Sequence, residues 1–289
     1  MAFEIIFLAT ALVGSSLAAI FDLKTTEIPD QIPYAMVAVA LIFHLIQAIL
    51  LRSYWPILSS LLWGLSLLGF GFLMYHFGQW GGGDAKVLSA IGFLIPELPQ
   101  SFGIKLLFPF PLSYSFNVFL VGAAYMLAYA FIIALIHKKI FSKFLDDIKA
   151  SSKVLSIGSF VLFISFFLIN WFLLKYFRIS FDILFILKSS FLPLIVTIAL
   201  FVVWKFAKVV ENVGFKKRIP ISKLKVGDVL LESKLWEGIT EKELTKIKKS
   251  GRRFVVVKEG VRFAGAFPLA LLFTIYMGDG LLLFMKFLI

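Results

Sequence analysis

Residues 32–51 read IPYAMVAVALIFHLIQAILL, a continuous run without aspartate, glutamate, lysine or arginine. An α-helix rises about 1.5 Å per residue, so about 20 apolar residues cross the roughly 30 Å hydrocarbon core of a bilayer. The sequence therefore predicts an all-α polytopic membrane protein with about six to eight transmembrane helices. The other apolar runs cover residues 3–21, 55–75, 85–95, 114–136, 154–176, 183–206 and 267–289.

Composition supports this class and excludes several chemistries. Of the 289 residues, 60% are hydrophobic and 16% are charged, whereas a soluble domain carries about 25% charge. The absence of cysteine excludes disulfides, cysteine-ligated zinc and thiol catalysis. The three histidines are scattered, so we expect neither a metal nor a cofactor. The first run lacks the basic start of a cleavable signal peptide, which predicts a retained first helix.

The basic residues indicate how the chain crosses the membrane. The net charge is +12, but no aromatic and basic platform for stacking bases is evident, so we expect no nucleic-acid partner. Basic residues concentrate in short cytoplasmic loops of membrane proteins. If all eight runs cross and the N-terminus lies outside, the lysine-rich segment 137–153 faces the cytoplasm. This orientation predicts a multi-pass protein of the cell membrane, with segments 22–31, 77–84, 137–153 and 207–265 on the cytoplasmic side.

The polar segment 207–265 predicts a small basic cytoplasmic α+β module inserted before the last helix. Residues 226–231 favour a turn and a strand, and residues 254–257 favour a second strand. Between them, Thr240 and Glu243 have the spacing of a capping box, and Gly251 favours a helix end. We therefore divide the chain into a membrane domain at 1–206, with catalytic residues within 1–100, this module, and a C-terminal transmembrane helix at 266–289.

Two aspartates carry the candidate chemistry. Asp22 follows the first apolar run in FDLKTTEIPD, residues 21–30, where a solvated loop carboxylate is the ordinary alternative. Asp84 lies in WGGGDAK, residues 80–86, where it could simply cap the next helix. The three glycines before Asp84 allow close approach of another backbone. An ionisable residue at the edge of a membrane core is a functional candidate.

The predicted topology places both aspartates on the same side, on different helices. Two carboxylates a few ångströms apart share a proton, because both cannot ionise easily. The ionised member can then take a proton from water that attacks a peptide carbonyl, while the protonated member polarises that carbonyl. No serine, metalloprotease or nucleotide-binding motif competes with this interpretation.

The residues around the two aspartates resemble a known family. Gly81-Gly-Gly83-Asp84 matches the GxGD signature of membrane aspartic peptidases, and Asp22 followed by Ile28-Pro29 is similar to the other aspartate motif of type IV prepilin and archaeal preflagellin peptidases. Residues 260–263, GVRF, also resemble the C-terminal part of archaeal members. The resemblance implies that Asp22 and Asp84 are catalytic at the cytoplasmic face and that Gly81 and Gly83 are motif glycines.

The resemblance also implies a substrate. These enzymes remove a short basic leader from precursors of pilins, archaellins or related filament subunits. Glu27 and Asp30 are candidate contacts for the positive leader. Thr26 and Asp30 stand where basic and asparagine residues are common in the family, and the chain lacks the cysteine-rich segment of methylating bacterial members. We therefore expect peptidase activity only, in an archaeal subgroup whose 207–265 module contacts membrane lipids or covers the active site.

Two other functions stay open from the sequence. A polytopic transporter or filament-assembly scaffold without peptidase activity would use Asp84 as a helix cap and Asp279 in a polar pathway. A presenilin-like protease shares GxGD but should place both aspartates within apolar helices, whereas Asp22 is expected in a polar loop. We expect a structural role for Asp279, paired with Lys188 or Lys286, and no firm role for Lys86. We further expect Asn117 and Asn170 to bridge helices.

Overall fold

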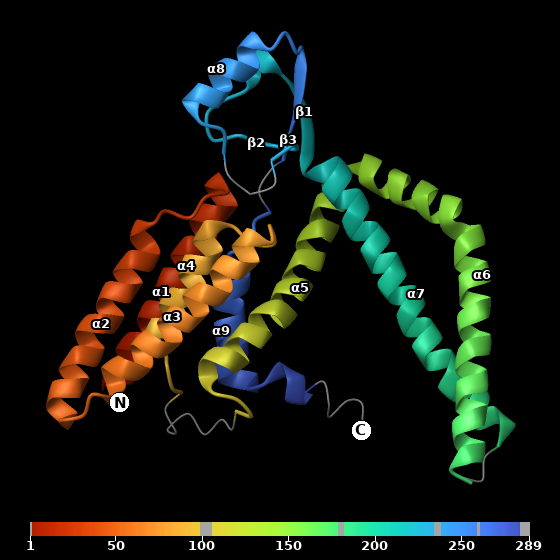
Figure 1. Cartoon of the computed structure of the whole chain (residues 1–289), viewed down its shortest axis with the longest axis horizontal. Coiled ribbons are helices and arrows are strands. Elements are labelled where there is room, and N and C mark those ends of the chain that lie inside the picture. Colours follow the sequence, from red (N-terminus) through yellow and green to blue (C-terminus); the bar gives the residue numbers. More distant parts are fainter. Residues whose placement is uncertain (1, 99–105, 179–181, 234–237, 259–260, 284–289) are drawn as a thin grey trace. The chain divides into compact units, whose positions relative to one another are not determined.

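The computed structural model describes residues 2–98, 106–178, 182–233, 238–258 and 261–283 (Figure 1). Six of its helices are long and apolar enough to cross a membrane. The elements are α1 Ala2–Thr25, α2 Gln31–Leu51, α3 Trp55–His76, α4 Gly82–Leu94, α5 Phe110–Ile136, α6 Lys138–Tyr176, α7 Ile183–Gly214, β1 Lys216–Pro220, η2 Ile221–Lys223, β2 Val229–Leu230, α8 Glu241–Lys249, β3 Phe254–Lys258 and α9 Ala266–Met277. The predicted polytopic helical fold with a small strand-containing module is confirmed.

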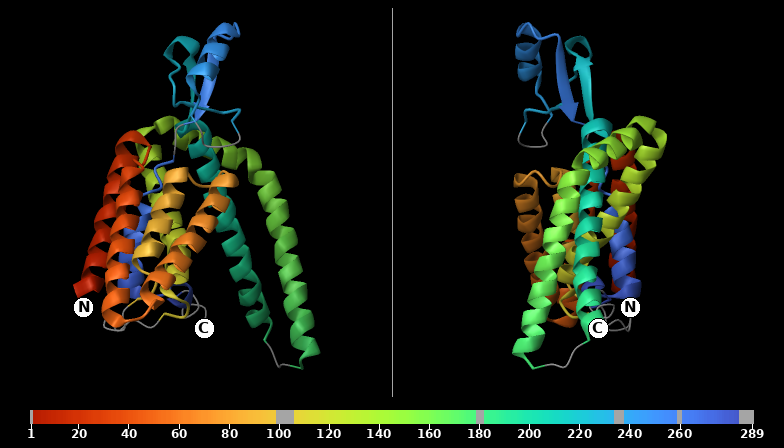
Figure 2. Two further views of the ribbon diagram at one scale, coloured as in Figure 1. Left: turned by 60° about the vertical axis from the view of Figure 1, so that its left-hand side comes forward. Right: turned by 90° about the vertical axis from the view of Figure 1, so that its right-hand side faces the viewer.

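The chain forms two compact units, residues 1–128 with 217–289, and residues 129–216. In the first unit, α1, α2 and α3 all contact the short helix α4, and the left view of Figure 2 shows these four helices side by side. Helix α4 is buried along almost its whole length, apart from Lys86. This explains the short apolar run at 85–95, because a helix enclosed by other helices does not need the length of a membrane span.

Small residues bring α3 and α4 into close contact. A Cβ atom built on Gly71 would lie 2.7 Å from the Cα of Ala85, so only glycine allows this approach. The hydroxyls of Ser60 and Ser89 donate across the interface to the carbonyls of Phe93 and Gly64, at 2.7 and 2.9 Å. Such small-residue contacts and interhelical hydrogen bonds hold helices together in lipid, where burial of apolar surface contributes little.

Several predicted boundaries are wrong. Helix α1 continues through Asp22 to Thr25, so Asp22 lies in the last helical turn rather than in a loop. Helix α6 begins at Lys138 and includes most of the expected 137–153 loop. That segment contains no glycine or proline, and the ion pair between Lys143 and Asp147, at 3.1 Å, has the i,i+4 spacing that supports a helix.

The expected continuous helix at 267–289 is also interrupted. Helix α9 ends at Met277, and Gly278 takes a positive φ of 77° before helical structure resumes at Gly280. Asn117 holds this break: its Nδ2 donates to the Gly278 carbonyl and to the Thr274 hydroxyl, both at 2.9 Å, and its Oδ1 accepts from the Gly280 N–H at 2.9 Å. The prediction that Asn117 bridges helices is confirmed.

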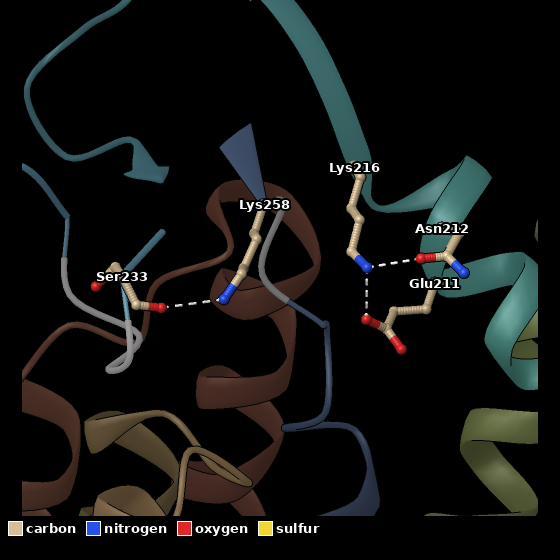
Figure 3. Close-up of polar contacts among 5 residues, drawn as sticks. All are labelled: Glu211, Asn212, Lys216, Ser233 and Lys258. Atoms are coloured by element: carbon tan, nitrogen blue, oxygen red, sulfur yellow. Dashed lines mark hydrogen bonds and ion pairs between the residues drawn. The ribbon is translucent and has the colours of Figure 1, made fainter. Parts of the chain in front are cut away.

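The second unit consists of the end of α5 and the antiparallel pair α6 and α7. Asn170 on α6 donates to the hydroxyl of Ser190 on α7 at 3.4 Å, as predicted. After α7 ends, the ammonium group of Lys216 contacts the Glu211 carboxylate at 3.0 Å and the Asn212 side-chain oxygen at 2.6 Å (Figure 3).

The α+β module forms inside the predicted segment 207–265, but it begins at β1, because α7 continues to Gly214 instead of ending at the predicted residue 206. Its sheet has the order β1-β3-β2, and β2 pairs antiparallel with β3. Thr240 and Glu243 form the predicted capping box: the Thr240 N–H donates to Glu243 at 2.8 Å, and the Glu243 N–H donates to the Thr240 hydroxyl at 3.4 Å. A small apolar core contains Leu224, Ile239, Val255 and Val257.

Candidate active site

Asp22 is a buried carboxylate in the last turn of α1. Its side chain is 6% exposed, and its Oδ2 accepts the backbone N–H of Ala264 at 2.9 Å. Ala264 lies just before α9, so this hydrogen bond joins the first helix to the last. Arg262, two residues earlier, lies close enough to Asp22 for electrostatic attraction. Asp22 is therefore not the solvated loop carboxylate that the sequence left open.

Asp84 is a buried carboxylate in the first turn of α4, outside the six candidate spans. Its side chain is 8% exposed, and its Oδ2 accepts the Gly81 N–H at 2.9 Å. The pKa of Asp84 is raised to about 7: burial raises it most, the Gly81 hydrogen bond lowers it, and the negative charge of Asp22 also raises it. Asp84 therefore holds the start of the helix and also retains a proton near neutral pH.

The glycines before Asp84 position the chain around it. Gly81 has an extended backbone that directs its N–H to the Asp84 carboxylate. A Cβ on Gly83 would lie 2.8 Å from the Cβ of Ile28, so Gly83 allows the segment after α1 to pack against the start of α4. The sequence suggested open backbone for a substrate beside these glycines. At Gly83, part of that space is filled by Ile28.

Both aspartates line one cavity of about 1190 Å³. Gly81, Gly83 and Glu27 also line it. Its apolar lining includes Trp80, whose ring stacks on Phe119 with centroids 5.4 Å apart. Basic side chains from the α+β module and the segment before α9 complete the wall. These are Lys217, Lys223, Lys225, Lys258 and Arg262.

Asp30, the second candidate leader contact, is not among the residues that line the cavity. Its Oδ1 accepts from the ammonium group of Lys86 at 2.6 Å. Lys86 also lies 5.6 Å from the centre of the Tyr34 ring. The ion pair joins the residue before α2 to α4, which gives Lys86 a structural partner that the sequence did not identify.

Asp279 lies away from this cavity. It is 5% exposed, and its carboxylate accepts the N–H of Leu107. Of the expected lysine partners, Lys286 lies outside the described residues, and no ion pair with Lys188 is present among the residues that the structure describes. A backbone hydrogen bond therefore compensates for the burial of Asp279, in agreement with the structural role expected for it.

Sequence reasoning missed the basic wall of the cavity and the Ala264 hydrogen bond. Arg262 was noted only within the GVRF resemblance. The one available signal was a cluster of basic residues between 208 and 265. Nothing in the sequence indicates which of them face the aspartates, because that depends on how the strands and loops of the module turn.

Comparisons with known proteins agree with the resemblance. Residues 7–138, which contain both aspartates, match the model of the type IV leader peptidase family. A prepilin peptidase, EppA, from Methanothermobacter thermautotrophicus is 23% identical over 46% of this chain and 37% of its own length. Preflagellin peptidases from Methanocaldococcus jannaschii and Methanococcus voltae are 32% and 33% identical, over 29% and 31% of this chain and 36% and 38% of their own lengths.

The alignments thus span little more than a third of each of these archaeal relatives. The region that matches the family model contains the helices that carry the two aspartates and their glycines, and it ends at the start of α6. Residues 7–138 of this chain are therefore similar to the type IV leader peptidase family.

Proposed function

We propose that this protein is a membrane aspartic endopeptidase that removes the short basic leader from pilin or archaellin precursors. One observation carries the proposal: two buried carboxylates, Asp22 and Asp84, come from different helices and line the same cavity. The family match and the peptidase activities of the relatives support the same function.

The mechanism follows from the different surroundings of the two carboxylates. Arg262 attracts the negative charge of Asp22, and burial favours the protonated form of Asp84. Asp22 accepts a proton from water, whose oxygen attacks the peptide carbonyl carbon, and Asp84 donates its proton to the carbonyl oxygen. The tetrahedral intermediate collapses and the C–N bond breaks. Asp22 passes its proton to the leaving amine, and Asp84 takes a proton back from a hydroxyl of the intermediate as the new carboxyl group forms.

The cavity suits a polypeptide substrate. Its volume of about 1190 Å³ exceeds the roughly 300–1,000 Å³ of sites for drug-sized molecules. Its walls combine aromatic rings with charged side chains, so it can receive both apolar and polar residues of a precursor. We assign Glu27 as a contact for a basic leader residue. Asp30 is the weaker candidate, because it is already paired with Lys86.

The proposed location is the cell membrane, with the cavity open to the cytoplasm. The module and cavity carry much of the excess positive charge of the chain, and basic residues favour the cytoplasmic side. A leader translated in the cytoplasm would meet the carboxylates there before its apolar segment enters the bilayer.

The structure changes how the two alternatives are weighed. The sequence argued against a presenilin-like protease by placing Asp22 in a polar loop. Asp22 is helical, which removes that argument. The family match now favours the leader peptidase instead. A transporter would place its ionisable groups near the membrane midplane, whereas Asp22 and Asp84 lie in terminal turns of their helices.

The test is cleavage of pilin and archaellin precursors in membranes by wild type, Asp22→Asn and Asp84→Asn. Each substitution should reduce cleavage by at least about a thousandfold, because a single carboxylate cannot both activate water and protonate the carbonyl. Asp146→Asn, an exposed aspartate that does not line the cavity, is the matched control and should cleave normally. Near-normal cleavage by either dyad variant would remove that aspartate from the mechanism.

A further inference from the structure

Positive charge exceeds negative charge on the wall of the aspartate cavity. Six basic residues line it in the described part of the chain, against four acidic residues. Two of these acidic residues are the aspartates of the proposed dyad, which would share a proton. The basic residues are Lys24, Lys217, Lys223, Lys225, Lys258 and Arg262, and the acidic residues are Asp22, Glu27, Asp84 and Asp228.

Three of these lysines are available to a ligand, and we call Lys24, Lys223 and Lys225 the cationic rim. All three are exposed. Within the described ranges, none of their ammonium groups forms an ion pair or a side-chain hydrogen bond. Asp228, the nearest wall carboxylate in sequence, accepts the backbone N–H of Lys225 at 2.7 Å and forms no ion pair with these lysines in the described part of the chain.

The other cations of the wall already have partners. The ammonium group of Lys258 donates to the Ser233 carbonyl at 3.1 Å, as Figure 3 shows. Arg262 attracts Asp22. These contacts fix two positive groups at the wall, and the cationic rim adds three exposed ones. A cavity lined in this way favours an anionic group.

We propose that the precursor segment entering this cavity carries an acidic side chain, which the cationic rim binds. The proposal rests on the proposed peptidase function and specifies its substrate. The basic leader is then not the part of the precursor that the rim recognises, because like charges would repel. Outside the dyad, the wall carboxylates are Asp228 and Glu27, and Glu27, on the segment after α1, is the candidate contact for a basic leader residue.

A peptide carboxylate fits the cavity better than a lipid headgroup does. The wall that carries the lysines also carries Met126, Ile219 and Val229, and the aromatic side chains of Trp80 and Phe119. A polypeptide presents apolar and charged side chains together, and under the proposed function it must reach Asp22 and Asp84 in the same space. A headgroup would leave the apolar part of the wall without a partner.

The experiment starts from a pilin or archaellin precursor that wild-type protein cleaves in nanodiscs of neutral phosphatidylcholine. Each position flanking the scissile bond is changed in turn to glutamate, glutamine or lysine, and kcat and KM are measured. We expect at least one position where glutamate lowers KM relative to glutamine and lysine raises it. An exposed ion pair changes affinity by about two- to fivefold, so a contact to two lysines should give up to about tenfold.

The rim variants identify the partner. In Lys223→Gln/Lys225→Gln, the ratio of KM for the glutamine precursor to KM for the glutamate precursor should fall toward one, while kcat stays unchanged. Lys242→Gln/Lys248→Gln on α8 removes the same charge from exposed positions that do not line the cavity, and should keep the wild-type ratio. A further check is Lys223→Glu, which should prefer the lysine precursor.

Each failure has a separate meaning. If wild type cleaves no precursor, the proposed function fails first. If cleavage depends on Asp22 and Asp84 but glutamate, glutamine and lysine precursors have equal KM at every position, the peptidase stands and the acidic-substrate proposal is overturned. If KM responds to phosphatidylglycerol in the nanodisc through Lys223 and Lys225, and not to precursor charge, the rim binds lipid and the proposal is also overturned.

Discussion

At the scale of single residues, the different environments of Asp22 and Asp84 are the central feature. Both are buried and both accept one backbone N–H, from Ala264 and Gly81 respectively. Only Asp22 has an arginine beside it. Because two neighbouring carboxylates titrate as a pair, this asymmetry decides which member more readily keeps the shared proton.

The raised pKa of Asp84 predicts an alkaline limb in the pH profile. Burial raises that pKa from its ordinary value to about 7, so the carboxyl stays protonated at lower pH and ionises as pH rises through about 7. If protonated Asp84 polarises the carbonyl, kcat/KM should fall about tenfold per pH unit above that value. Full recovery after return to pH 6.5 would separate titration from unfolding. An activity that rises through pH 7 would contradict the assignment.

At the scale of elements, the contact between α3 and α4 sets the position of Asp84. A Cβ on Gly71 would meet the backbone of Ala85 at 2.7 Å, and Ala85 follows Asp84 directly. The neighbouring Gly69 on the same helix has nothing within 4 Å of its built Cβ. These two glycines therefore form a matched pair for testing how the helix contact affects the site.

Gly71→Ala should displace α4 and lower precursor cleavage by about tenfold or more, since a shift of about 1 Å in a catalytic group can cost up to a hundredfold. The extra methyl should also destabilise the protein by about 1–3 kcal/mol. Gly69→Ala should keep normal cleavage and an equal or higher melting temperature, because its methyl group meets no neighbour and alanine favours a helix over glycine. Cleavage assays and thermal unfolding in detergent check both, and equal behaviour of the two variants would show that the contact does not position Asp84.

At the scale of the whole molecule, orientation in the membrane is the property to test. The chain has no cysteine, so a single introduced cysteine gives an unambiguous labelling site. Arg52 lies in the turn between α2 and α3, and Lys248 lies on α8 in the module. Both side chains are exposed, and the proposed topology places them on opposite sides of the membrane.

In intact cells, a membrane-impermeant maleimide should label Arg52→Cys and should not label Lys248→Cys. After permeabilisation, both should react, and the cysteine-free wild type should never react. This pattern follows from the preference of basic segments for the cytoplasmic side. Labelling of Lys248→Cys from outside would reverse the proposed topology and place the cavity outside the cytoplasm.

The sequence by itself determined the features that depend on local pattern. Apolar runs longer than about 18 residues predict membrane helices, and the spacing of Thr240 and Glu243 predicts the cap of α8. These rules act within a helix or across one turn, so they need no knowledge of the fold. The local pattern also pointed to Asp84, which follows three glycines, whereas Asp22 was selected over Glu27 and Asp30 by the resemblance to a known family.

Only the tertiary structure decided what surrounds those residues. The helical position of Asp22, its hydrogen bond to Ala264, the pairing of Asp30 with Lys86 and the lysines on the cavity wall were not predicted. The Asp22 contact joins residues 242 positions apart, and no local periodicity reports such a distance. Burial and long-range hydrogen bonds depend on how helices pack, and in lipid that packing is set by small residues and polar contacts between segments far apart in the chain.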